Sequence, residues 1–250
     1  MIDVALTPAA LRRAHTTVVI DALRATSTAI SALAAGYRRV RAVPDIETAL
    51  ALRRPGRVLA GEHRYVTPPE LHHGNSPADA AQRRGDELVL ATTNGTPAII
   101  AAAQVSETVL LASMLNLAAT AELLADSAGD VQLLCSGSEG AVALEDVYVA
   151  GRLATLLRGR RSDAALLAQA ICRRYETPLH AFEASAAAGR LRAAGLERDI
   201  ADCARESELD VVAAAVVAQY GCTITTRPPD PRHVAATTPQ PLDEIVAPAA

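Results

Sequence analysis

The chain has 250 residues, half of them hydrophobic and only 2% aromatic, so we expect a core built from Ala, Val, Leu and Ile. The formal net charge is -4, no basic block occurs, and no apolar run reaches about eighteen residues, which argues against a nucleic-acid partner and a membrane span. All 24 basic residues are arginines, so a Schiff-base lysine and a P-loop lysine are excluded, and a phosphate would be held by arginine, backbone N–H groups, hydroxyls or a metal.

Short β-branched runs alternate with Ala/Leu-rich helical patterns along the first two thirds of the chain. The pattern predicts strands at 17–20, 38–43, 57–61, 87–93, 108–113 and 130–136. It predicts helices at 27–36, after Asp45, and at 76–84, 96–104, 117–127 and 144–159. Ser76 and Thr96 are expected to cap two of these helices, each with a proline at the next position. Such an alternation is typical of an α/β fold with a largely parallel or mixed sheet covered by helices.

The remaining third of the chain has a different pattern. Residues 160 to about 220 show helical spacing, which predicts a helical C-terminal region within a single α/β domain of residues 1–225. Residues 226–250 are rich in Pro and Thr, which predicts an irregular tail. The first residues lack the layout of a signal peptide, so we expect a cytoplasmic protein. The four cysteines form no CxxC pair, which disfavours a zinc site and a disulfide framework.

Several expected strands run into polar loops that open a helix, and open α/β sheets bind ligands at that edge. In TTNGTP, the free N–H groups and the dipole of the helix start favour an anion. The same residues would also suit an ordinary capped loop without a ligand. The polar residues at these loops are Asp21, Arg24, Thr26, Glu62, Asn75, Ser76, Thr93, Asn94, Gly95, Thr96, Asn116, Glu145 and Asp146.

The acidic residues of these loops suggest a metal. Asp21 ends a buried strand and needs a partner, which is either Arg24 in a structural ion pair or a hard cation such as Mg²⁺. Glu145 and Asp146 have a simpler explanation as partners of a helix dipole. Two or three acids beside an anion-binding loop would make a phosphoryl-transfer site. Other catalytic motifs are missing, because Cys135 has no arginine at cysteine-phosphatase spacing and neither GxSxG nor a strand-linked GxGxxG occurs.

Six runs occur in an order that resembles the 2-phosphosulfolactate phosphatase family: VVIDALRATSTAISALAAG, GEHRY, HGNSPADA, TTNGTPAI, SMLNLAATA and LLCSGSEGAVALEDVYVAG. The resemblance is close over about residues 15 to 155. It continues more loosely to about residue 215, where GLERDIADCARESELDVV resembles the family's Gly-x-x-x-Asp-Ile helical region. It implies a three-layer α/β/α fold and Mg²⁺-dependent hydrolysis of (2R)-phospho-3-sulfolactate, a step toward coenzyme M. The run SELDVVAAAV departs from the family pattern, so another small phosphate ester could be the substrate.

The resemblance and the chemistry of the side chains together give each site residue an expected role. We expect catalytic roles for Asp21, Arg24, Glu145 and Asp146, and metal-ligand roles for Asp21, Glu62, Glu145 and Asp146. We expect the substrate to contact Thr26, Asn75, Ser76, Thr93, Asn94, Gly95, Thr96 and Asn116.

The sequence is compatible with several alternatives. Asp21 is either a metal ligand or a nucleophile that attacks phosphorus. A non-catalytic anion-binding or regulatory protein on the same scaffold and a nucleotide-dependent transferase are the competing functions. The exposed faces of the Ala/Leu-rich helices would also suit a homodimer.

Overall fold

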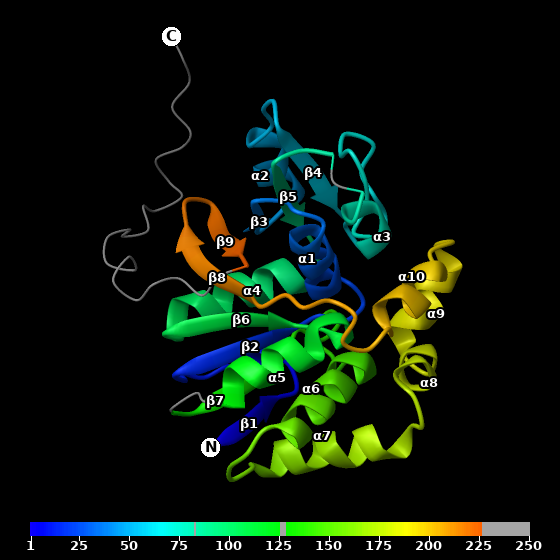
Figure 1. The fold of residues 1–250 in the computed structure, drawn as a ribbon. Helices are drawn as coiled ribbons and strands as arrows, with labels where there is room; N and C mark the ends of the chain where they lie inside the picture. Colours follow the sequence, from blue (N-terminus) through cyan, green and yellow to red (C-terminus); the bar gives the residue numbers. More distant parts are fainter. Residues whose placement is uncertain (83, 126–128, 227–250) are drawn as a thin grey trace.

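The computed structural model describes residues 1–82, 84–125 and 129–226 (Figure 1). The described residues form a nine-stranded mixed sheet with the strand order β1-β7-β2-β6-β8-β9-β3-β5-β4. The strands are β1 (Ile2–Ala5), β2 (Thr16–Ile20), β3 (Arg39–Val43), β4 (Arg57–Gly61), β5 (Glu87–Ala91), β6 (Thr108–Ala112), β7 (Val131–Cys135), β8 (Ala213–Ala218) and β9 (Gly221–Thr225).

Helices cover both faces of this sheet, which gives the expected three-layer α/β fold. They are α1 (Ala25–Ala34), α2 (Ile46–Ala51), α3 (Pro77–Ala80), α4 (Gly95–Val105), α5 (Leu117–Ala125), α6 (Leu144–Leu156), α7 (Asp163–Arg174), α8 (Pro178–Glu183), α9 (Ala186–Ala193) and α10 (Arg198–Cys203). Two short 3₁₀ helices, η1 (Pro8–Ala10) and η2 (Met114–Asn116), follow β1 and β6.

The apolar strands are explained by these two helix layers. Successive side chains of a strand point to opposite faces of the sheet. In β2, Val18 and Ile20 belong to the core that includes residues of α5, α6 and α7, whereas Val19 belongs to the core that includes residues of α1 and α4. Because both faces are buried, the strand sequence is apolar throughout rather than alternating.

The antiparallel hairpin β8–β9 makes the sheet mixed, which the predicted fold allows, but the helical pattern expected up to about residue 220 is wrong here. β8 pairs antiparallel with β6, and β9 pairs antiparallel with β3, so the hairpin joins two parallel halves (Figure 1). The prediction extended a helix through residues 213–220. A short continuous apolar run such as AAAVVA fits a buried strand and a buried helix equally well, so its periodicity does not decide between them.

Several boundaries also differ from the prediction. The helix expected at 76–84 is only Pro77–Ala80, and the helix expected to start at Thr96 begins at Gly95, with Asn94 at the N-cap position. β1 was not predicted. The strand at 57–61 is confirmed, and Asp45 is confirmed as a cap because its Oδ1 accepts the Thr48 N–H at 2.8 Å. The predicted helical residues 126–127 and the tail at 227–250 lie outside the described residues.

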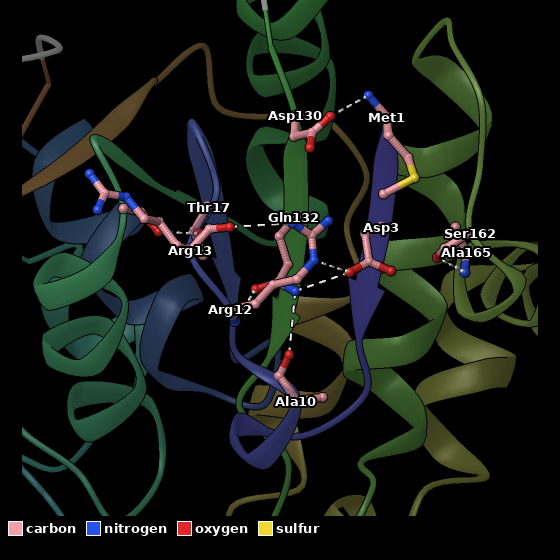
Figure 2. Close-up of polar contacts among 11 residues, drawn as sticks. Met1, Asp3, Ala10, Arg12, Arg13, Thr17, Asp130, Gln132, Ser162 and Ala165 are labelled. Atoms are coloured by element: carbon pink, nitrogen blue, oxygen red, sulfur yellow. Dashed lines mark hydrogen bonds and ion pairs between the residues drawn. The ribbon is translucent and has the colours of Figure 1, made fainter.

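Polar contacts fix the edge strand β1 to its neighbour β7. Asp3 Oδ2 accepts hydrogen bonds from Arg12 Nε at 2.9 Å and from Gln132 Nε2 at 3.1 Å (Figure 2). The terminal amine of Met1 contacts Asp130 at 2.8 Å. These pairs hold strands together and lie outside the pocket, so Asp3 can serve as a control for the acids of the site. Within the part of the chain that the structure describes, no helix is long and apolar enough to cross a membrane.

Candidate active site

A pocket of about 510 Å³ lies where the loops after β2, β4, β5 and β7 approach helix α9. Its position outside the carboxyl ends of parallel strands is the one expected for a ligand site in an α/β fold. Its walls carry both charge signs, with acids and arginines on different segments. The lining residues are Asp21, Leu23, Arg24, Glu62, Arg64, Tyr65, Val66, Asn75, Thr93, Asn94, Ser138, Glu139, Arg190, Ala193 and Ala194.

Asp21 immediately follows β2 and is held by the start of α1. It is buried, with 8% of its surface exposed, and its Oδ1 accepts the Ala25 N–H at 3.0 Å. The Thr26 hydroxyl accepts the Asp21 N–H at 3.1 Å and lies 2.8 Å from the carbonyl oxygens of Asp21 and Ala112. Thr26 therefore fixes the backbone that carries the carboxylate.

Gly95 allows the loop after β5 to reach Asp21. A Cβ at this position would lie 2.4 Å from Asp21 Oδ2 and 2.4 Å from the Ala25 Cβ. No side chain fits at these distances, so the close approach of α4 to α1 requires glycine here.

Arg24 lines the pocket but does not form the ion pair with Asp21 that the sequence suggested. Its Nη1 donates to Oδ2 of Asp199 in α10 at 2.6 Å, and both side chains are almost completely buried. The second carboxylate oxygen of Asp199 accepts the Ser76 hydroxyl at 2.7 Å. Ser76 thus holds Asp199 and does not cap α3 through its side chain.

Glu62 connects the loops after β4 and β5. Its Oε1 accepts the Thr93 N–H at 2.9 Å, and its Oε2 accepts the Tyr65 N–H at 2.6 Å and lies 3.2 Å from the Thr93 hydroxyl. Both oxygens are therefore already hydrogen-bonded, which makes Glu62 an organiser of the pocket wall.

Glu145 and Asp146 begin helix α6 and are buried beneath the pocket loops without lining the pocket. Asp146 joins two loops, because its Oδ1 accepts the Ala22 N–H at 2.8 Å and its Oδ2 accepts the Gly137 N–H at 3.0 Å. Glu145 differs, since its Oε2 is buried and has no hydrogen-bond partner. An orphaned carboxylate oxygen in the interior is costly unless a proton or a cation satisfies it.

The pKa values of these acids are raised. Burial, together with the charge of Glu62, raises the pKa of Asp21 to about 6. Burial and the charge of Asp21 raise the pKa of Glu145 to about 7, although a hydrogen bond from Ser185 acts in the opposite direction. Burial and the charges of Glu145 and Asp21 raise the pKa of Asp146 well above its ordinary value. The three carboxylates repel one another and favour a proton or a cation.

The donor set suits a hard cation. The described residues contain no group of three or more His, Cys, Asp or Glu side chains placed to hold one metal ion. Mg²⁺ does not require such a group, because it usually binds one or two carboxylates and completes its shell with water and phosphate oxygens. Asp21 and the unpartnered Oε2 of Glu145 fit this mode of binding.

The other residues expected to contact substrate fall into two sets. Asn75, Thr93 and Asn94 line the pocket, and the Asn75 Oδ1 is buried without a partner. Thr96 and Asn116 are occupied elsewhere. Thr96 exchanges hydrogen bonds with Thr92, and Asn116 accepts the Ser113 N–H and donates to the Leu111 and Val211 carbonyls.

Sequence reasoning missed the arginine that the C-terminal region contributes. Arg190 in α9 donates to the Ser138 hydroxyl at 2.7 Å and to the Tyr65 hydroxyl at 3.3 Å, and its guanidinium lies 6.0 Å from the centre of the Tyr65 ring. Nothing in the Ala-rich sequence around Arg190 distinguishes it from a solvated helical arginine. Asp199 could have been singled out, since it is the aspartate of the GLERDI run.

Comparisons with known proteins show which family the chain resembles. The family model described as 2-phosphosulpholactate phosphatase matches residues 3–217. A relative from Thermus thermophilus is 43% identical over 194 residues, which cover 75% of this chain and 82% of the relative. A relative from Thermotoga petrophila is 37% identical over 222 residues, which cover 86% of this chain and 96% of the relative. Both relatives are named probable 2-phosphosulfolactate phosphatase. The resemblance found in the sequence motifs is thereby confirmed, and this chain belongs to the 2-phosphosulfolactate phosphatase family.

Proposed function

We propose that this protein is a Mg²⁺-dependent phosphomonoesterase that hydrolyses (2R)-phospho-3-sulfolactate, or a closely related small phosphate ester, to the alcohol and phosphate. Its family and the names of its relatives support the reaction. The observation that carries the proposal is the pocket itself, which is lined by buried Arg24 and by buried Asp21, with the raised-pKa acids Glu145 and Asp146 behind it.

Arg24 is the residue that would bind the phosphoryl oxygens. A guanidinium presents several N–H donors in a planar fork that matches a phosphate, and burial strengthens each charge-assisted bond. Asn75 and the loop Thr93–Asn94 add polar groups to the same pocket.

Asp21 and Glu145 would hold the metal. When bound, Mg²⁺ neutralises charge on the phosphate and polarises a water for attack on phosphorus. Asp146 and Glu62 act on the loops instead, because their oxygens already accept backbone N–H groups. The alternative role of Asp21 as the nucleophile predicts a covalent phosphoryl-enzyme and burst kinetics, which the ligand role does not.

Arg190 would bind the second acidic group of the substrate. A sulfolactate phosphate carries a sulfonate and a carboxylate beside the phosphate ester, and both need cationic partners. Arg190 reaches the pocket from α9 and is held by Ser138 and Tyr65. Arg64 also lines the pocket but is paired with Glu139 at 3.0 Å.

The test is a hydrolysis assay on (2R)-phospho-3-sulfolactate and on simpler phosphate esters, with Mg²⁺ and with EDTA, for the wild type and Asp21→Asn. We expect activity only with Mg²⁺, a loss of about a hundredfold or more in Asp21→Asn, and a preference for esters with a second anion. Asp3→Asn is the matched control, since Asp3 is a partly buried carboxylate of β1 that pairs with Arg12 and lies outside the pocket. Activity in EDTA, or no activity on any ester, would contradict the proposal.

A further inference from the structure

Asp199 has no role in the proposed function, although it lies in the family-like run GLERDI. Only 4% of its surface is exposed, and each of its carboxylate oxygens accepts a hydrogen bond. The Arg24 guanidinium donates to one oxygen at 2.6 Å, and the Ser76 hydroxyl donates to the other at 2.7 Å. The three residues come from the loop after β2, the start of α3 and helix α10.

This arrangement controls the direction of Arg24. A guanidinium on a long side chain can rotate and carries several donors in a rigid plane. The contact with Asp199 uses Nη1, and Arg24 lines the pocket, so a fixed Nη1 fixes the direction of the remaining donors. Asp199 is therefore placed to orient the group that meets the phosphate.

The choice of partner for Arg24 also has a consequence for Asp21. Arg24 and Asp199 are 175 residues apart, whereas Asp21 is a carboxylate three residues from Arg24. A pair of Arg24 with Asp21 would have satisfied both charges locally, but it would have occupied the acid of the site. Pairing with Asp199 leaves Asp21 available and keeps Arg24 in place.

We propose that Asp199 is a positioning residue that orients the Arg24 guanidinium toward the phosphoryl group of a bound ester, and that Ser76 holds Asp199 in the required rotamer. The inference rests on the proposed function only in that the pocket binds phosphate. It assigns a task to the C-terminal helical region, which supplies the partner of a residue on the first βα loop.

A double-mutant cycle tests this role, with inorganic phosphate as the probe. The dissociation constant of phosphate is measured by calorimetry, and kcat and KM are measured on the ester, for Asp199→Asn, Arg24→Gln and the double variant. We expect each single variant to weaken phosphate binding about tenfold or more, and the double variant to be no worse than Arg24→Gln alone. Phosphate binding within about twofold of the wild type in Asp199→Asn, or losses that multiply in the double variant, would overturn the proposal.

Two further variants separate positioning from a merely structural role. Ser76→Ala keeps the Arg24–Asp199 pair and is expected to weaken phosphate binding about threefold, with no further loss in the Arg24→Gln background. If Asp199→Asn does not fold, Ser76→Ala decides, and unchanged phosphate binding in it counts against the proposal. Asp3→Asn removes the charge from a more exposed Arg–Asp contact, that of Arg12 with Asp3 in β1, and should leave phosphate binding unchanged. A purely structural role of Asp199 would lower the melting temperature but leave phosphate binding by the folded protein intact.

Failure of the proposed function gives a different result from failure of this inference. A wild type that hydrolyses no ester but binds phosphate refutes the proposed function, and the cycle then decides on Asp199 from phosphate binding alone. A wild type that does neither refutes both.

Discussion

Asp21→Asn is expected to inactivate the protein and at the same time to stabilise its metal-free form. Burial and the charge of Glu62 raise the pKa of Asp21 from 3.8 to about 6. A shift of about two pKa units corresponds to ~3 kcal/mol between the two protonation states. Because the folded pKa is raised, folding favours the protonated acid. Above about pH 6, where Asp21 is ionised, the free energy of unfolding of the wild type is therefore lower by this amount. This destabilisation disappears as the pH falls toward about 4 and Asp21 becomes protonated in both states. Asparagine has no charge and can still accept the Ala25 N–H.

Thermal unfolding in EDTA, followed from about pH 4 to about pH 8, measures this effect. Near pH 8 we expect Asp21→Asn to be more stable than the wild type by ~3 kcal/mol, or ~6–12 °C in melting temperature, and the difference to close between about pH 6 and about pH 4. A variant that is less stable than the wild type near pH 8, or a difference that does not depend on pH, would refute the reasoning.

Asp3→Asn is the control of opposite sign. Burial acts to raise the pKa of Asp3, but hydrogen bonds from Ser162, Gln132 and Arg12 outweigh it and lower the pKa. The bonds from Gln132 and Arg12 are drawn in Figure 2. A lowered folded pKa contributes stability above the unfolded value, and that contribution is lost as the pH falls through the folded pKa. Asp3→Asn should therefore be less stable than the wild type near neutral pH, and this deficit should shrink in acid.

Three other predictions use different parts of the structure. In Gly95→Ala, the new Cβ would lie 2.4 Å from Asp21 Oδ2 and displace the carboxylate. We therefore expect kcat/KM to fall about tenfold or more while the circular dichroism spectrum stays unchanged. Unchanged kinetics would contradict a role of the Asp21 position in catalysis. Millimolar Mg²⁺ should raise the melting temperature more at about pH 8 than at about pH 5, because Asp21 and Glu145 must lose protons to bind it, and a pH-independent increase would argue for another site. Glu87→Gln removes a carboxylate whose Oε2 lies 2.9 Å from Arg57 Nε and 3.2 Å from Arg41 Nε. We expect the free energy of unfolding in urea to fall by about 3 kcal/mol while kcat/KM stays unchanged. A large kinetic loss would mean that this cluster also shapes the pocket.

The parallel part of the fold could be predicted because its signal is local. β2, β5 and β7 are apolar runs that end in polar residues, and each lies within two residues of its predicted position. The acids Asp21 and Glu62 were found for the same reason, since each comes directly after a strand and parallel strands end at the same edge of the sheet.

The hairpin β8–β9 and the Arg24–Asp199 pair could not be predicted in this way. The choice between helix and strand for Ala213–Ala218 depends on β6, more than a hundred residues earlier, which offers an edge for pairing. The partner of Arg24 is likewise set by the packing of α10 and not by neighbouring residues. A short-range pattern contains no information on either contact.

Residue type alone also does not separate ligand contacts from loop contacts. Thr26, Thr96 and Asn116 were expected to meet the substrate, and the structure shows their side chains bonded to backbone groups. Hydroxyl and amide side chains at helix starts can do either. A direct contact of these residues with substrate stays a prediction, whereas their effect on the shape of the loops follows from the geometry.

The distribution of charge in the site is itself an argument for function. Arg24 is neutralised by Asp199, while Asp21, Glu145 and Asp146 are buried, and the charge of Asp21 adds to burial in raising the pKa values of Glu145 and Asp146. A site arranged only for stability would pair Arg24 with Asp21, its nearest carboxylate in sequence, and would leave no orphaned oxygen on Glu145. In the observed arrangement, Arg24 is held in a fixed direction by Asp199, and no arginine neutralises Asp21 or Glu145 through an ion pair within the described residues. Buried groups with perturbed pKa values that gather at or behind a pocket are typical of functional sites. A phosphate ester would satisfy the arginine, and a divalent cation would satisfy the acids.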